Sequence, residues 1–478
     1  MAERVADAEN PGLARALGPG MAIAIVVGNV IGAGIFLKPG EAATQAGSVW
    51  LAIAAWVAGG VLSLLGALTI AELALRLPQA GGLYVYLREA FGRPIGFLFG
   101  WSEFVIGVPA SIGALAAGLA GMSGAIADRH FSVWEESAIA IGAILVLTAI
   151  NVVGVAWGGR TQLATTAVKC LFLAALAALP FVLSALGYSG IDASNYRDTT
   201  EPAGGSEASL PVRFAGALLA VLWAYSGWHA VAPVAEEVKS PRRNIPIALL
   251  GGGVLLAALY LAIVLAYHGT LPMREIRDAG IRLPQAMTAR LLSPFGSGVT
   301  GAVVIGISVA AFISIAGSLN ANLMSGPRVG FAMARDGVFP HALSIVHARF
   351  RTPAAAIVTQ ATLSIVLVVS SATLVATVER FRARSVFELL TDCVTFIASI
   401  FLMLAVAAIF PIRWKRRGDS SPGYVTPFYP WVPLAYIAAS ALFVVYVFGG
   451  KPVEASTGVI LTLAGLPFYW WMTHRTRQ

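Results

Sequence analysis

The sequence predicts an all-α polytopic membrane protein with twelve transmembrane helices. Of its 478 residues, 58% are hydrophobic and only 12% are charged, whereas a soluble chain has about 25% charged residues. Twelve stretches of at least 20 residues lack Asp, Glu, Lys and Arg, and about 20 apolar residues suffice to cross the hydrocarbon core. Their apolar residues are continuous rather than alternating, which excludes a β-barrel. The stretches are residues 16–37, 42–71, 104–127, 137–159, 170–191, 214–235, 244–273, 291–327, 352–378, 393–412, 420–450 and 455–474.

The basic residues of the chain indicate its orientation. The net charge of +8 does not indicate a nucleic-acid partner, because the 32 basic residues are spread along the whole chain. If both termini are cytoplasmic, the inner segments hold 19 basic residues and the outer loops 11, which agrees with the positive-inside rule. We therefore expect a multi-pass protein of the cell (inner) membrane with cytoplasmic N- and C-termini. Residues 1–18 form the N-terminal cytoplasmic segment and are too polar for a secretory signal.

Several functional classes find no support in the sequence. No polar stretch is long enough for an inserted catalytic domain, and the phosphate-binding pattern GxxxxGK[ST] is absent, so ATP-driven transport is not expected. Neither a metal-ligand cluster nor a nucleophile elbow is recognisable, so we expect no enzyme and no cofactor. The two cysteines, Cys170 and Cys393, lie in apolar stretches and indicate no disulfide framework.

Two spans carry small and polar residues near their centres. Span 1 contains residues 28–36 (GNVIGAGIF) followed by Pro39, and span 6 contains residues 223–229 (WAYSGWH) followed by Pro233. Such segments are typical of discontinuous helices, whose freed backbone groups must line a cavity or bind a ligand. Tight helix packing through small residues is the alternative. The interruptions fall at equivalent positions of a five-plus-five inverted repeat, which favours a transporter binding site.

The chemistry of two such breaks matches a zwitterion. The N-terminus of a resumed half-helix presents amide groups and a positive dipole end to an anion. The carbonyl groups that end the first half present partial negative charge to an ammonium group. An α-amino acid carries both charges, so it is the substrate that we expect.

Four segments carry a resemblance to a known family: Gly28 to Pro39 (GNVIGAGIFLKP), Trp223 to Pro246 (WAYSGWHAVAPVAEEVKSPRRNIP), Gly317 to Pro340 (GSLNANLMSGPRVGFAMARDGVFP) and residues 457–471 (TGVILTLAGLPFYWW). With them the chain resembles the amino acid–polyamine–organocation (APC) superfamily, and within it most closely the L-type amino acid transporter family. It implies the leucine-transporter fold with helices 1 and 6 broken.

The same resemblance divides the chain into repeats. Residues 19–188 would form the first five-helix repeat, residues 211–412 the inverted second repeat, and residues 425–474 helices 11 and 12.

The resemblance also implies a substrate site. The substrate carboxylate would meet the amides of Ala33 and Gly34, and its ammonium group the carbonyls of Val30, Trp223 and Ser226. The full implied set is Val30, Ile31, Gly32, Ala33, Gly34, Trp223, Ala224, Ser226, Gly227, His229 and Asn320. For His229 a structural role is the alternative to substrate contact, and for Asn320 the alternative is an interhelical hydrogen bond.

Aromatic and charged residues suggest two gates. The resemblance makes Trp223 an outer gate that closes over the substrate, with lipid-interface anchoring as the alternative. Glu236 and Glu237, which precede Arg242 and Arg243, suggest ion pairs of an inner gate. Solvated surface pairs that contribute little are the alternative for these glutamates.

Three ionisable residues lie inside spans, where such residues are costly and indicate function. Lys169 resembles the family lysine that replaces a sodium ion, so its ammonium group would bridge carbonyls near Gly28 and the hydroxyl of Ser318. Snorkelling to the interface is the alternative. Glu103 matches an acidic position of the family, with a structural or gating role. Asp392 departs from the family pattern and suggests either a proton site or a hydrated residue near the outer end.

These features predict a sodium-independent secondary transporter of amino acids, an exchanger or proton-coupled, that works by alternating access. Small or medium neutral L-amino acids are the expected substrates, because the implied pocket positions are apolar and Trp223 limits the volume. These positions are Val108, Pro109, Ile112 and Gly113 on span 3 and Ile397 and Ala398 on span 10. A cationic amino acid or polyamine transporter is the alternative, and a membrane amino-acid receptor is the alternative outside transport. The loop between spans 3 and 4 lacks cysteine, so we expect no disulfide-linked heavy chain and a monomer or weak homo-oligomer in the lipid bilayer.

Overall fold

The computed structural model describes residues 13–32, 34–127, 129–200, 202, 209–379, 395–417, 423–450 and 452–475. The helices up to residue 224 are α2 (Pro19–Val30), α3 (Gly34–Ala46), α4 (Val49–Arg76), α5 (Leu83–Phe91), α6 (Arg93–Trp101), the π-helix η1 (Ser102–Gly107), α7 (Val108–Ala127), α8 (Val133–Val153), α9 (Val155–Ala185), the 3₁₀ turn η2 (Ala193–Arg197) and α10 (Leu210–Ala224).

The second half of the chain is also helical. Its elements are η3 (Ala235–Glu237), α11 (Pro241–Pro246), the π-helix η4 (Ile247–Gly251), α12 (Gly252–Thr270), α13 (Met273–Ala279), η5 (Gly280–Arg282), α14 (Leu283–Leu292), η6 (Ser293–Phe295), α15 (Ser297–Ser325), α16 (Pro327–Arg335), η7 (His341–Ser344), α17 (Ala354–Thr377), α19 (Thr395–Ala407), α20 (Ile409–Lys415), α21 (Trp431–Gly450), α22 (Pro452–Leu463) and α23 (Gly465–Arg475). Extended structure in the described residues amounts to two isolated β-bridges, Leu17 with Val238 and Ser48 with Thr199.

Each of the twelve uncharged stretches contains helix. Within the described residues, eight helical segments are long and apolar enough to cross a membrane, and the bent pair α2–α3 makes a ninth. The shorter apolar helices α10 and α21 occupy two further stretches, and the pair α22–α23 occupies the last. The prediction of an all-α, multi-pass integral membrane protein is confirmed. The division into repeats at residues 19–188, 211–412 and 425–474 stays a prediction.

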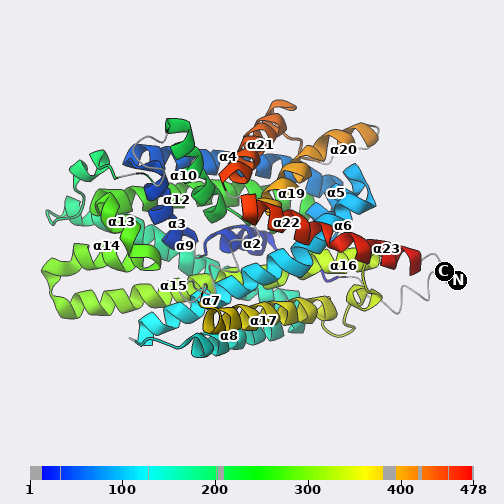
Figure 1. Cartoon of the computed structure of the whole chain (residues 1–478), viewed down its shortest axis with the longest axis horizontal. Coiled ribbons are helices and arrows are strands. Elements are labelled where there is room, and N and C mark those ends of the chain that lie inside the picture. The colour runs from blue at the N-terminus through cyan, green and yellow to red at the C-terminus, as the bar shows by residue number, and fades with distance from the viewer. Residues whose placement is uncertain are drawn as a thin grey trace.

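The helices form two groups around the central helix α2 (Figure 1). Helices α7, α8, α15 and α17 pack together on one side, and α4, α10, α12 and α21 lie on the other. Helix α2 packs against α9, α12 and α15. Figure 1 places α5, α16, α20 and α23 at one end of the molecule and α13 and α14 at the opposite end. The predicted topology would place the first of these ends in the cytoplasm, and this orientation stays a prediction.

A glycine turn leads into the short helix α5 at the same end. Gly81 and Gly82 have φ angles of +103° and +50°, which glycine adopts more readily than other residues. A Cβ atom at Gly82 would lie 2.6 Å from the backbone nitrogen of Pro233. The turn therefore allows the chain before α5 to lie directly against the segment that follows span 6.

Candidate functional site

Span 1 is interrupted where the sequence predicts it. Helix α2 ends at Val30, Ile31 and Gly32 are not helical, and α3 begins at Gly34 after a bend of 42°. Ala33, an implied ligand of the substrate carboxylate, lies outside the described residues. A Cβ atom at Gly34 would lie 2.9 Å from Cα of Ala224. The absence of a side chain at Gly34 thus lets the resumed helix of span 1 touch the end of α10.

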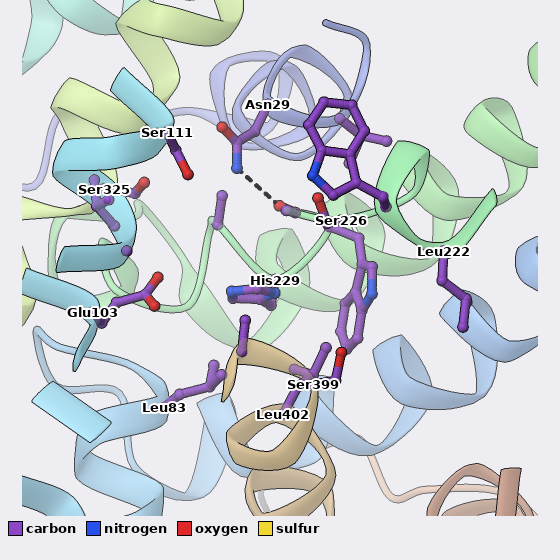
Figure 2. Close-up of a pocket in the computed structure, with 18 of the residues that line it drawn as sticks. Asn29, Leu83, Glu103, Ser111, Leu222, Ser226, His229, Ser325, Ser399 and Leu402 are labelled. Carbon is purple, nitrogen blue, oxygen red and sulfur yellow. Dashed lines mark hydrogen bonds between the residues drawn. The ribbon is translucent and has the colours of Figure 1, made fainter. Parts of the chain in front are cut away.

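Span 6 is also interrupted, but differently from the prediction. Helix α10 ends at Ala224, residues 225–234 form a run of turns and a bend, and the 3₁₀ turn η3 follows. The expected resumed half-helix is thus not an α-helix. Gly227 has a φ of +96°, and a Cβ atom there would meet the side chain of Asn29 at 2.5 Å. Glycine at this position lets the amide group of Asn29 donate a hydrogen bond to the Gly227 carbonyl at 3.2 Å (Figure 2).

Two further polar residues tie the breaks to neighbouring helices. The hydroxyl of Tyr260 donates to the Val30 carbonyl at 2.9 Å and lies 3.3 Å from the Ala224 carbonyl. The Asn322 amide donates to the side-chain oxygen of Asn29 at 2.9 Å. The Val30 carbonyl, expected to meet the substrate ammonium, therefore already accepts a hydrogen bond from Tyr260. Tyr260, Asn29 and Asn322 were not among the predicted site residues, although polar side chains inside apolar stretches were a signal for all three.

A cavity of about 260 Å³ lies between the two breaks and extends toward α5, α19 and α21. It is lined by backbone and small side chains from the interrupted segments, together with residues from α4, η1, α7, α15, α19 and α21. Of the predicted substrate residues, those that line it are Val30, Gly32, Gly34, Trp223, Ala224, Ser226, Gly227 and His229. The pocket positions implied on spans 3 and 10 contribute Val108 and Ala398.

Trp223 lies beside the outer part of span 1. Its ring is 3.2 Å from the position that a Cβ atom at Gly34 would take. The ammonium group of Lys38, on α3, lies 4.9 Å from the centre of the Trp223 ring and forms an ion pair with Glu41. A cation over an indole face is attractive, so these contacts fix the ring at the edge of the cavity. The role of Trp223 as a gate stays a prediction.

Lys169 reaches the end of α2 from α9, and we call this cluster the Lys169 site (Lys169, Gly28, Ile31 and Ser318). The buried ammonium group donates to the carbonyls of Gly28 and Ile31 at 2.7 and 2.6 Å and to the Ser318 hydroxyl at 3.1 Å. The Ser318 hydroxyl lies 2.9 and 2.8 Å from the same two carbonyls. Carbonyls at a helix C-terminus carry partial negative charge, which the ammonium group compensates. The contacts are those of a bridge from span 5 to spans 1 and 8, not of a snorkelling lysine.

Ile31 and Asn320 do not line the cavity. The Ile31 carbonyl belongs to the Lys169 site, and Asn320 lies buried among α8, α9 and α15. The Asn320 amide donates to Gln162 at 2.8 Å, and its oxygen accepts from Asn151 at 2.8 Å. The assignment of Asn320 to substrate contact is therefore corrected to its alternative, interhelical hydrogen bonding. An asparagine amide offers the same donors and acceptors to a substrate as to a neighbouring helix, so the sequence did not distinguish these two roles of Asn320.

The two glutamates at the inner end of span 6 pair with other arginines than expected. Glu237 is buried and forms a two-point ion pair with Arg328 of α16, at 2.8 and 3.2 Å. Glu236 pairs with Arg335 of α16 at 3.0 Å and accepts a hydrogen bond from the Ala80 backbone at 3.1 Å. The expectation that Arg242 and Arg243 are the partners is wrong, because α16, distant in sequence, packs against this segment.

The N-terminal segment reinforces that inner end. The Leu17 amide donates to the Glu237 carbonyl at 3.0 Å, and the Lys239 amide donates to the Leu17 carbonyl at 2.8 Å. Leu17 itself is fully buried. Backbone hydrogen bonds and a buried ion pair thus hold the segment after span 6 against α16 and the N-terminal segment.

Glu103 and His229 face the inner part of the cavity, which we call the Glu103 chamber (Glu103, His229 and the cavity between them). Figure 2 shows the two side chains pointing toward each other from η1 and from the turns after α10. Glu103 lies in a π-helix, a distortion that is frequent at functional sites. Its carboxylate makes no hydrogen bond or ion pair within the described part of the chain, and the buried Nδ1 atom of His229 has no hydrogen-bond partner there. Asp392, the other intramembrane acid, lies outside the described residues.

Comparisons with known proteins identify the family and relatives of the chain. A family model described as amino acid permease matches residues 17–472. The serine/threonine exchanger SteT of Bacillus subtilis (strain 168) is 33% identical over 98% of this chain and 99% of its own length. The Asc-type amino acid transporter 1 of Mus musculus is 28% identical over 97% of this chain and 82% of its own. The human cystine/glutamate transporter is 28% identical over 94% of this chain and 83% of its own.

Proposed function

This chain belongs to the amino acid permease family of the APC superfamily, and on that premise we propose that it is a secondary transporter of amino acids that works by alternating access. The observation that carries the proposal is the meeting of two interrupted spans at one cavity in the membrane interior. Unpaired backbone groups in lipid are tolerated only where they line a cavity or bind a ligand. The relatives named above are transporters and exchangers rather than enzymes, which agrees with a non-enzymatic role.

The proposed binding mode uses both breaks. Gly34 begins α3, so the amide end of this helix attracts the carboxylate group of the substrate. Trp223 and Ser226 line the same cavity, and their carbonyl groups are the proposed acceptors for the substrate ammonium group, with the Trp223 carbonyl also accepting a hydrogen bond from the Ser226 amide at 3.1 Å. Since Tyr260 occupies the Val30 carbonyl, we assign that carbonyl a smaller share of ammonium binding.

Transport by this chain is proposed to be independent of sodium. An ammonium group with three oxygen neighbours at 2.6 to 3.1 Å occupies the junction of α2, α9 and α15. A fixed positive charge there repels a sodium ion and satisfies the same oxygens. The junction can then remain intact without a bound metal ion throughout the cycle.

Neutral L-amino acids of small or medium size are the proposed substrates. The cavity is lined mainly by glycine, serine, alanine, leucine and valine, and Trp223 borders it. Glu103 supports a second candidate, a cationic amino acid or polyamine, because it is the only acidic residue among those that line the cavity in the described part of the chain.

In the proposed cycle the inner end of span 6 opens to the cytoplasm. The Glu237–Arg328 ion pair and the Leu17 hydrogen bonds separate in that step, and Trp223 closes the outer side. We also propose that the protein resides in the cell membrane with both termini in the cytoplasm.

A substrate panel on purified protein in proteoliposomes tests these proposals. Uptake of labelled serine, alanine, leucine and lysine is measured with and without the same amino acid inside, in sodium and in choline buffer. We expect exchange of neutral amino acids that is equal in both buffers. Sodium-stimulated uptake would refute the cation-surrogate role of Lys169, and binding without flux would indicate a receptor instead.

A further inference from the structure

Glu103 and His229 face each other inside the Glu103 chamber. The Glu103 carboxylate is half-buried and makes no hydrogen bond or ion pair in the part of the chain that the structure describes, and the His229 ring makes no hydrogen bond there. Figure 2 shows both side chains directed into the same cavity. On the basis of the transport function proposed above, we propose that this chamber binds a proton, and that one proton crosses the membrane with each neutral amino acid.

The π-helix η1 directs Glu103 into the chamber. The hydroxyl of the preceding residue, Ser102, lies 2.9 Å from the hydroxyl of Thr462 on α22. The Glu103 carbonyl accepts a hydrogen bond from the Val108 amide at the start of α7. Neighbouring residues thus anchor η1 on both sides while the carboxylate itself stays available. Such π-helical distortions are frequent at functional sites.

Glu103 has no positive charge beside it to neutralise it. The helices that pack most closely on η1 are α6, α7, α16, α17 and α19. In their described residues the ionisable side chains are Arg93, exposed at the start of α6, and Arg328 and Arg335 of α16, which pair with the glutamates after span 6. Asp392 lies outside the described residues. A proton is therefore a direct way to neutralise the Glu103 carboxylate.

His229 is likewise remote from other charges in the described structure. On its side the cavity is lined by α4, α5, α19 and α21, and the described parts of α19 and α21 carry no charged residue. The ionisable residue of these helices that lines the cavity is Tyr436. The charged residues of α4 and α5 form ion pairs within their own helices, Glu72 with Arg76 and Arg88 with Glu89.

The imidazole of His229 suits a carboxyl group that gains and loses a proton. The His229 carbonyl accepts a hydrogen bond from the Ala232 amide at 2.9 Å, which helps to hold the turn that carries the ring. The buried Nδ1 atom has no hydrogen-bond partner in the described chain. A neutral imidazole has one acceptor nitrogen and one N–H donor. It can accept a hydrogen bond from a protonated Glu103 and donate one to the carboxylate.

Substrate binding is coupled to the proton through desolvation. An ionised carboxylate in the membrane interior is costly unless it is solvated or paired. The cavity of about 260 Å³ joins Glu103 to the two interrupted spans, so closure around a substrate removes solvent from the chamber. A zwitterionic amino acid brings no net charge to compensate for the carboxylate. A Glu103 oxygen therefore takes a proton from the outer solution before closure and releases it when the cavity opens to the inner side.

Proton uptake on substrate binding tests this site without any flux. Serine or alanine is added to the purified full chain in weakly buffered detergent with a pH indicator, over a series of pH values. We expect wild type and the control Glu89→Gln to take up about one proton per bound amino acid at the alkaline end, where affinity falls up to about tenfold per pH unit. Glu103→Gln should take up none. Binding by wild type without proton uptake at any pH would overturn the proton site.

Flux in proteoliposomes gives a second readout. An inward gradient of about two pH units, acidic outside, should raise accumulation of labelled serine at least about tenfold, against a limit of about 100-fold for one proton per substrate. In Glu103→Gln the ratio of accumulation with and without the gradient should fall to about one, whatever the absolute rate. The two wild-type readings decide the proposal even if this variant does not fold.

The outcomes separate the proton site from the transport function. Wild-type exchange that ignores the gradient would overturn proton coupling and leave the transport function standing. Absence of all flux would refute transport, and with it the crossing of protons, while the proton count in detergent still decides the site. Loss of lysine uptake in Glu103→Gln, with no effect of pH on serine uptake by wild type, would overturn the proposal in favour of a site for a cationic side chain.

Discussion

The Lys169 site and the Glu103 chamber place ionisable groups in the membrane interior in opposite ways. Lys169 is fully buried, and its ammonium group donates hydrogen bonds to three oxygens. These bonds join α9 to the end of α2 and to α15. Glu103 and His229 border a cavity and lack such partners in the described residues. Charged groups are costly in lipid. The ammonium group of Lys169 has hydrogen-bond partners, whereas the carboxyl group of Glu103 faces a cavity, so we expect the two residues to have different roles. We expect Lys169 to hold the three helices together, and Glu103 and His229 to contact whatever molecule enters the cavity.

Replacing Lys169 should have the largest effect. Lys169→Ala leaves the Gly28 and Ile31 carbonyls and the Ser318 hydroxyl without their cation, at about 1–3 kcal/mol for each unsatisfied group. We expect uptake in proteoliposomes to fall more than about 100-fold, and Lys169→Arg to restore it only in part, because a planar fork replaces a compact charge. The exposed Leu171→Ala on the same helix is the control. Near-normal flux in Lys169→Ala would show that the bridge is dispensable.

Filling the break in span 1 should come next. In Gly34→Val the new side chain meets the backbone of Ala224 at 2.9 Å and the Trp223 ring, so uptake should drop about 10- to 100-fold, as overpacking by 1–3 kcal/mol implies. Gly142→Val on α8 is the matched control, since a Cβ atom there meets nothing within 4 Å. Labelled-substrate uptake and folded yield are measured together. Normal uptake by Gly34→Val would remove Gly34 from the binding site.

Removing the indole of Trp223 should separate transport from binding. Trp223→Ala takes away a ring at the edge of the cavity but none of the backbone groups that hold the substrate. We expect transport to fall about tenfold and equilibrium binding to change less than about threefold, because closure rather than docking is lost. Scintillation proximity binding and proteoliposome uptake give the two values. Equal, small changes in both would mean that the ring only packs.

Neutralising the Glu103 chamber should alter selectivity more than stability. Glu103→Gln leaves no ion pair broken in the described structure, so the folded yield should be unchanged. Competition by lysine for uptake should weaken about tenfold or more, since a hydrogen bond to a charged group contributes about 1.5–3 kcal/mol. Glu89→Gln, outside the cavity, is the control. Unchanged competition would show that the carboxyl group does not meet a cationic substrate.

Asn320 should give the smallest change in transport. Its hydrogen bonds to Asn151 and Gln162 join α15 to α8 and α9, and such bonds contribute about 0.6 kcal/mol each on average. Asn320→Ala should therefore lower thermal stability slightly and leave the KM of uptake unchanged. A changed KM with normal stability would return Asn320 to the substrate site.

The sequence by itself determined the fold class and the position of the breaks. Uncharged stretches long enough to span lipid leave the backbone little alternative to helix, and each stretch contains helix in the described structure. Gly28, Gly32 and Gly34 marked the interruption in span 1, because a helix loses stability where glycines gather in its centre. Lys169 was recognisable as a residue that needs partners inside the membrane, since an isolated charge in an apolar span is costly.

Only the tertiary structure decided which partners those residues have. Arg328, Arg335, Tyr260 and Asn320 lie far in sequence from the groups they bind, and a hydrogen bond leaves no periodic trace in either segment. The sequence therefore suggested the adjacent Arg242 and Arg243 for the span-6 glutamates, whereas packing of α16 supplies Arg328 and Arg335. Likewise, composition shows that a polar residue is buried, but whether it faces a cavity or a neighbouring helix depends on how the helices pack around it.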